Sequence, residues 1–106
     1  MVKAIKFSYS KDSDILYIGV KNSKKIQGSA EVGDFILDFT HDGELVGLEI
    51  LNASKNIMKI TKRLLSQINK IDFVVKYNSN HISIGILMFF PKGMRKEVNI
   101  PIMVSR

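Results

Sequence analysis

Residues 31–54 of this chain, E-V-G-D-F-I-L-D-F-T-H-D-G-E-L-V-G-L-E-I-L-N-A-S, decide the fold. Apolar side chains recur at alternate positions on both sides of Asp42-Gly43, which is the period of a half-buried strand. An Asp-Gly pair between two such runs is typical of a tight hairpin turn. Asn52 or Ser54 can cap a following helix, because a short side-chain oxygen accepts the free amide hydrogens of the first turn. The stretch therefore predicts two paired strands and the start of a helix.

Toward the N-terminus the chain predicts a second hairpin. Ile5, Phe7 and Tyr9 alternate with polar residues, and a second apolar run occupies residues 15–20. Between them lies the turn-forming sequence S-K-D-S-D at residues 10–14. Residues 21–28 are polar and are expected to form a loop that leads to the strands of residues 31–54.

The helix is expected at about residues 54–69. At 100° per residue, Ile57, Ile60, Leu64 and Ile68 fall on one stripe. The opposite side carries the basic residues Lys55, Lys59, Lys62 and Arg63. The pattern predicts an amphipathic helix with its apolar stripe on the sheet and a basic face toward solvent.

Three more strand-like runs follow, at residues 71–77, 82–90 and 94–102. Pro101 has no amide hydrogen to donate to a ladder, so the last strand is expected to lie at a sheet edge or to end there. The sequence thus predicts a single α+β domain over residues 1–106, with an antiparallel sheet of six to seven strands built from hairpins. One amphipathic helix (about 54–69) packs on one face, and the element order is β-β-β-β-α-β-β-β.

Composition excludes several classes of function. The chain has no cysteine, which rules out thiol chemistry, disulfides and zinc–thiolate sites. Its longest apolar run, residues 84–90, is far shorter than the ~20 residues that a membrane-spanning helix needs. The first residues, M-V-K-A-I-K-F, lack the apolar core of a secretory signal. We expect a cytoplasmic protein with no membrane association and no cofactor.

The net charge of +6 is unevenly distributed. Residues 1–50 carry six lysines against eight Asp and Glu, a balance of −2. Residues 51–106 carry ten Lys and Arg against Asp72 and Glu97, a balance of +8. Such asymmetry is typical of proteins that bind nucleic acid or an acidic partner, but a generally lysine-rich composition produces it as well.

Two carboxylates could form an acid–base pair or a metal site. Asp38 and Glu49 lie on the two strands that flank the Asp42-Gly43 turn, and a suitable register would bring them together and raise the pKa of one of them. The simpler alternative is that both are solvent-side strand residues. No catalytic residue and no metal ligand is assigned.

The run at residues 82–90 has apolar side chains on both faces. Ile84, Ile86 and Met88 point to one side, where the helix can cover them, whereas Leu87 and Phe89 point to the other. An uncovered apolar patch on a sheet promotes aggregation. Either the sheet curls on itself or a second copy covers the patch, which makes Leu87 and Phe89 candidate residues of a homodimer interface.

The first half of the chain resembles a family of small prokaryotic proteins, domain of unknown function 2283. The resemblance covers residues 5–55, and its most specific part is D-G-E-L-V-G-L-E-I-L-N-A-S at residues 42–54. Tyr9, the D-I-L-Y-I run at residues 14–18, Glu31-Val32 and the I-L-D run at residues 36–38 also match. The resemblance implies a small α+β domain without established enzyme activity. Some members resemble the antitoxin of a two-gene toxin–antitoxin pair, which implies a small toxin-like protein as partner.

These observations favour a non-catalytic binding or regulatory module that acts through protein–protein association, with an antitoxin-like role as one form. An alternative is a nucleic-acid-binding protein that uses the basic helix face of Lys55, Lys59, Lys62 and Arg63. A further alternative is a weak enzyme or metal site around Asp38 and Glu49.

Overall fold

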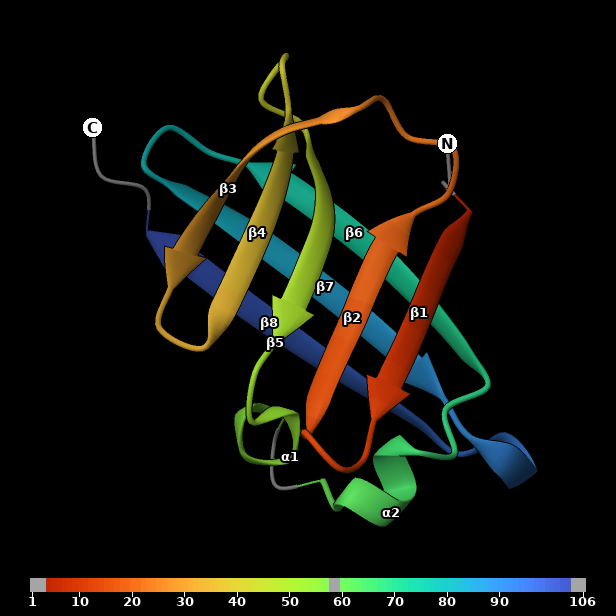
Figure 1. The fold of residues 1–106 in the computed structure, drawn as a ribbon. Helices are drawn as coiled ribbons and strands as arrows, with labels where there is room; N and C mark the ends of the chain where they lie inside the picture. The colour runs from red at the N-terminus through yellow and green to blue at the C-terminus, as the bar shows by residue number, and fades with distance from the viewer. Residues whose placement is uncertain (1–3, 58–59, 104–106) are drawn as a thin grey trace. The chain divides into compact units, whose positions relative to one another are not determined.

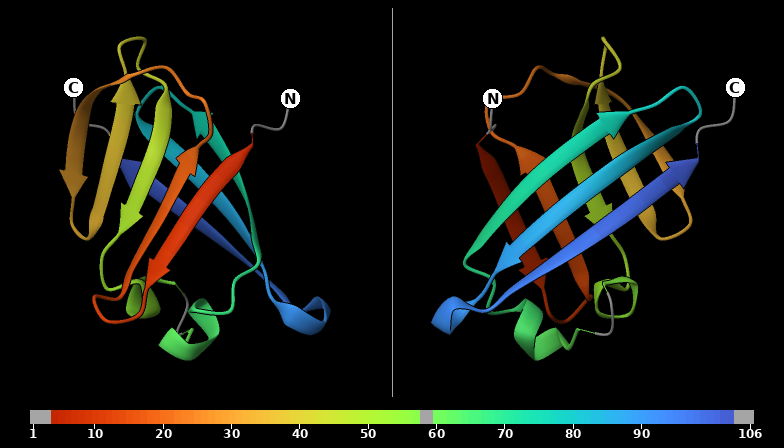
Figure 2. Two further views of the ribbon diagram at one scale, coloured as in Figure 1. Left: turned by 45° about the vertical axis from the view of Figure 1, so that its right-hand side comes forward. Right: turned by 180° about the vertical axis from the view of Figure 1, so that it is seen from behind.

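The computed structural model describes residues 4–57 and 60–103 (Figures 1 and 2). The chain divides into two compact units, Met1–Ser66 and Gln67–Arg106. The first unit contains β1 (Ile5–Ser10), β2 (Ile15–Val20), β3 (Ile26–Val32), β4 (Phe35–Thr40), β5 (Leu45–Ile50), α1 (Ala53–Asn56) and α2 (Lys62–Leu65). The second contains β6 (Lys70–Tyr77), β7 (His81–Phe89) and β8 (Arg95–Met103), with a 3-10 turn at Pro91–Gly93 between the last two strands.

The first unit is a five-stranded antiparallel sheet in the order β1-β2-β5-β4-β3. The hairpin of β4 and β5 around Asp42-Gly43 confirms the prediction from residues 31–54, with Phe35 opposite Ile50 and Leu37 opposite Leu48. Gly43 has a φ of +82°, which a glycine adopts without steric strain. The core residues of this sheet lie on one side and are fully buried: Leu16, Ile18, Leu37, Leu48 and Ile50.

The second unit is a three-stranded antiparallel sheet in the order β6-β7-β8. Its buried side chains come from alternate positions, with Ile82, Ile84, Ile86 and Met88 on β7. β8 lies at an edge, as Pro101 predicted, and it continues past Pro101 to Met103.

The α+β class and the antiparallel pairing are confirmed, but the prediction of one sheet with six to seven strands is wrong. The described residues contain eight strands in two sheets. The unpredicted strand is β3, which begins inside the expected polar loop of residues 21–28. All seven of its side chains are exposed, and Gly28, Ser29 and Ala30 carry no apolar alternation. A strand that buries none of its side chains leaves no periodic apolar signal in the sequence.

The prediction of one amphipathic helix at residues 54–69 is also wrong, and the segment forms two four-residue helices instead. α1 ends at Asn56, and the next residue, Ile57, is non-helical with a φ of −108° and a ψ of 75°. α2 begins after Thr61, an extended residue whose side chain accepts a hydrogen bond from the Leu64 amide at 3.1 Å. Ile57, Ile60 and Thr61 are β-branched and lose rotamer freedom in a helix, which favours the break. The observed element order is therefore five strands, two helices and three strands.

The helix prediction can also be compared with the structure residue by residue. Of the predicted apolar stripe, Ile57 and Ile60 are buried, whereas Leu64 and Ile68 are half-exposed and the neighbouring Leu65 is buried in their place. Asn52 occupies the residue before α1 but makes no side-chain cap, and its φ is 50°. Neither helix in the described part of the chain is long enough to cross a membrane.

Candidate functional site

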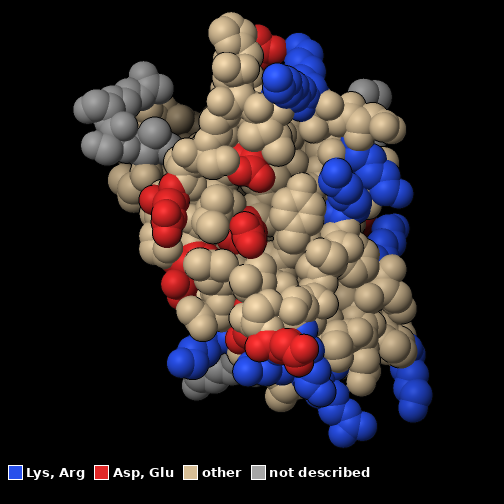
Figure 3. Space-filling model, viewed as in Figure 1, with Lys and Arg blue, Asp and Glu red and all other residues tan. Residues whose placement is uncertain are grey.

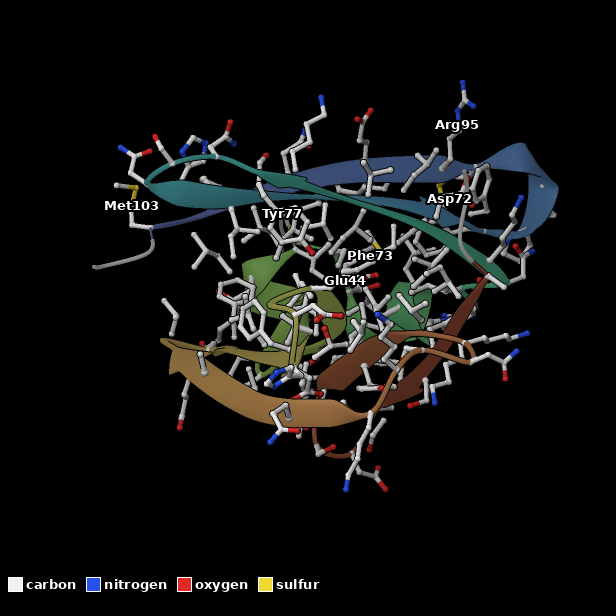
Figure 4. The ribbon with its side chains drawn as sticks, turned by 90° about the horizontal axis from the view of Figure 1, so that it is seen from above. Glu44, Asp72, Phe73, Tyr77, Arg95 and Met103 are labelled. Atoms are coloured by element: carbon white, nitrogen blue, oxygen red, sulfur yellow. The ribbon has the colours of Figure 1, made fainter. Side chains whose placement is uncertain are left out.

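The second unit has one buried and one open sheet face. Along β7, buried and half-exposed residues alternate without interruption, because successive side chains of a strand point to opposite sides. In Figure 4, Arg95 projects from one side of this sheet and Phe73 lies on the other. The open face is the side formed by Lys70, Asp72, Val74 and Lys76 of β6, His81, Ser83, Gly85, Leu87 and Phe89 of β7, and Arg95, Glu97, Asn99, Pro101 and Met103 of β8.

The strand register brings charged residues to both sides of the apolar residues of β7. Leu87 lies opposite Asp72 on β6 and opposite Glu97 on β8. One row further along, Phe89 lies between Lys70 and Arg95. The open face therefore carries an acidic row and a basic row, each with an apolar residue at its centre.

Lys70 partly covers Phe89. The Lys70 Nζ lies 5.2 Å from the centroid of the Phe89 ring, within the range of a cation–π contact. The same nitrogen lies 4.0 Å from the Asp72 Oδ1, and both side chains are exposed to solvent. Exposed ion pairs of this kind contribute on the order of 0–1 kcal/mol, so Lys70 and Asp72 remain free to exchange partners.

A depression lies at the centre of the open face. Its volume is about 370 Å³, and residues of all three strands line it. Gly85 forms the floor of the central row, where Val74 and Asn99 are its cross-strand neighbours. A Cβ atom on Gly85 would meet the Asn99 Oδ1 at 3.4 Å and the Val74 carbonyl oxygen at 3.7 Å, so the floor is bounded closely by its neighbours. Val74 is itself 58% exposed at the edge of the depression.

Leu87 and Phe89, the predicted dimer residues, both lie on the open face and are half-exposed. Alternation along one strand was sufficient to predict this. The charged rows and the depression could not be found in that way, because they depend on the register of β6 and β8 against β7. The one local signal of the depression was Gly85, a glycine inside a strand pattern.

Asp38 and Glu49, the predicted carboxylate pair, do not lie opposite each other. Asp38 faces Gly47, and Glu49 faces Ile36 and, on its other side, Tyr17. The Ser29 hydroxyl donates a 2.6 Å hydrogen bond to Asp38, whose Oδ2 would lie only 2.8 Å from a Cβ on Gly47. Figure 3 shows Asp and Glu side chains on this side of the first sheet, over β3 to β5. Among the described residues, no three His, Asp or Glu side chains are close enough together to hold a metal ion.

Asp14 connects the first hairpin to the start of α1. It is buried, with a φ of 56°, and its carboxylate accepts hydrogen bonds from the Tyr9 hydroxyl (2.6 Å), the Ser54 hydroxyl (2.7 Å) and the Ser54 amide (3.1 Å). Burial alone would raise the pKa of Asp14, but these hydrogen bonds and the nearby charge of Lys62 lower it on balance. The pKa of Tyr9 is raised by burial and by its hydrogen bond to Asp14. The sequence predicted a turn here and missed the contact to Ser54, forty residues away.

The basic residues expected on one helix face do not form a single stripe. Lys55 belongs to α1, whereas Lys62 and Arg63 begin α2 beyond the break in the helix. All three are exposed, and Lys59 lies outside the described residues.

Comparisons with known proteins place the chain in context. The family model described as "Protein of unknown function (DUF2283)" matches residues 6–54, which lie in the first unit. An uncharacterized protein of Methanocaldococcus jannaschii is 30% identical over 94 residues, which cover 89% of this chain and 78% of that protein. An alignment of that length extends beyond the first unit into the second. No solved structure matches the chain.

Proposed function

The chain belongs to the family described as "Protein of unknown function (DUF2283)", and we propose that it is a non-catalytic binding or regulatory module that acts through protein–protein association. The association surface is the open face of β6, β7 and β8. The family match ends at residue 54, so this surface belongs to the part of the chain that follows the matched residues.

The observation that carries the proposal is a group of exposed apolar side chains flanked by charged ones on the neighbouring strands. Val74, Leu87 and Phe89 expose apolar surface, and the β6 and β8 residues beside Leu87 and Phe89 are all charged. Protein interfaces combine a desolvated apolar centre with a polar rim that remains wet. An apolar sheet surface with this surround is typical of an interaction site.

The proposed module has two forms of association. One is a homodimer through the open face, and the other is a complex with a small toxin-like protein, for which this chain would be the antitoxin. Nucleic-acid binding by the basic helix face is less well supported, since the continuous helix that would align Lys55, Lys62 and Arg63 is not formed.

The proposal is tested by removing apolar surface from the open face. We expect the variant L87S/F89S to lose association, because it removes the two central apolar side chains of the face. The matched control is I26S/V32S, which removes two exposed apolar side chains from β3 of the first unit (45% and 41% exposed). Sedimentation velocity measures self-association, and co-purification with the co-expressed product of the adjacent gene measures binding of a protein partner.

The proposal holds if either kind of association is lost in L87S/F89S and kept in I26S/V32S. It fails if the two variants behave alike. It also fails if the parent chain associates with neither itself nor the co-expressed protein at about 100 µM, a concentration at which even weak specific complexes form.

A further inference from the structure

The open face has a charge pattern with a centre. Val74 lies in the middle of β6. Asp72, two residues before it, and Lys76, two residues after it, lie on the same face. The central row of the face is Val74, Gly85 and Asn99, which carry no charge. On β6, opposite charges therefore lie at equal distances on either side of the uncharged row, whereas on β8 the position that matches Glu97 is Pro101.

Two symmetric arrangements centre the face on a second copy with the strands of the two copies aligned, and the charges distinguish them. If the two-fold axis runs along the strands, β6 lies on the partner's β8. Asp72 then faces the partner's Glu97, and Lys70 faces the partner's Arg95, which places like charges together in both rows. Such contacts are destabilising. If the axis runs across the strands along the central row, β6 lies on the partner's β6, and Asp72 faces the partner's Lys76.

The sizes of the side chains favour the same axis. With the axis along the central row, Leu87 faces the partner's Ser83, beside the depression at the partner's Gly85. A large side chain thus meets the two smallest positions of β7, once in each direction. Packed sheets lie about 10 Å apart and cross at about 30°, so these central rows stay in contact while the corners of the face separate.

Building on the proposed function, we propose that the open face binds a second copy of this chain, with β6 antiparallel to the partner's β6. Val74 lies against the partner's Val74. Asp72 pairs with the partner's Lys76, and the partner's Asp72 pairs with Lys76. An interface of this kind is isologous, since the same surface serves both copies.

Charge reversal at the two positions tests the orientation. D72K alone and K76D alone each replace two attractive contacts by two repulsive ones, and we expect dimerisation on the order of 50-fold weaker. A mixture of D72K with K76D restores both attractive contacts. The two substituted side chains then face each other with opposite charges, and the unaltered Lys76 of the first variant faces the unaltered Asp72 of the second. Sedimentation equilibrium on each variant and on the mixture measures the result. D12K and K11D, exposed in the β1–β2 turn, are controls with the same changes of net charge.

A folding defect cannot produce recovery on mixing, so the mixture separates misfolding from loss of the interface. The inference is supported if D72K and K76D are monomeric alone and form a heterodimer together, while D12K and K11D dimerise like the parent chain. It is overturned if a dimer forms that both reversals leave unchanged, or if the mixture stays monomeric. If the parent chain is monomeric at about 100 µM yet L87S/F89S loses a different protein partner, the inference fails and the proposed function stands.

Discussion

At the scale of single residues, the strongest polar contact is the one around Asp14. Three hydrogen bonds from Tyr9 and Ser54 converge on its buried carboxylate. Hydrogen bonds to a charged acceptor are roughly twice as strong as neutral ones, and a buried donor left without its acceptor is costly. Tyr9, Asp14 and Ser54 all lie within residues 6–54, the range that the family model matches.

We expect D14N to lower the free energy of unfolding at pH 7 by about 1–3 kcal/mol. The pKa of Asp14 is lower in the folded chain than its ordinary value, so this stability is present at neutral pH and is lost as the pH falls below about 4. Urea denaturation between pH 7 and pH 3 measures both effects. The difference between the parent chain and D14N should narrow with acid, while D12N, exposed in the same turn, should stay close to the parent throughout. A constant difference across this range would contradict the assignment.

At the scale of elements, the break between α1 and α2 has a sharp test. Lys62 is the first residue of α2, where proline is favoured, because its fixed φ suits the helix and its missing amide hydrogen has no helical partner. Thr61 is extended, the conformation that a following proline requires. We therefore expect the stability of K62P to lie within about 1 kcal/mol of that of K62A, as measured by urea denaturation. In a continuous helix over residues 54–69 the same substitution would cost about 3 kcal/mol or more.

The elements that the sequence predicted well are those with a local signal. The β4–β5 hairpin follows from Asp42-Gly43 and the alternation on both sides. β3 was missed because Gly28, Ser29 and Ala30 pair through their backbone and bury no side chain. In the segment after Ile50, the helical period marked Ile57 and Ile60 correctly as buried but placed Leu64 on the buried side, where the structure buries Leu65 instead. These residues can be buried without lying on one helix, so the helical period did not reveal the break between α1 and α2.

At the scale of the whole molecule, the partition of eight strands into two sheets within the described residues could not be read from the sequence. Which strands pair is decided by contacts between segments far apart, and a half-buried strand has the same period in either sheet. The candidate site has the same limit. Leu87 and Phe89 were predicted from β7 alone. The positions of Asp72, Lys76 and Gly85 relative to one another on the open face depend on the register of β6 against β7, which the sequence did not predict.

The net charge of +6 makes the salt dependence of association informative. In the proposed dimer, salt screens two exposed Asp72–Lys76 pairs, each worth at most about 1 kcal/mol, and also screens the repulsion between two positive copies. These two effects of salt oppose each other, and the contacts between apolar side chains are insensitive to charge screening. We expect the dimerisation constant of the purified protein to change less than about tenfold between roughly 50 and 500 mM NaCl, as measured by sedimentation equilibrium. Association through bound nucleic acid would instead weaken by about a thousandfold or more with several phosphate contacts. Each such contact contributes about −0.9 to the slope of the logarithm of the binding constant against the logarithm of the salt concentration. A loss of that size would identify nucleic acid, rather than the open face, as the cause of association.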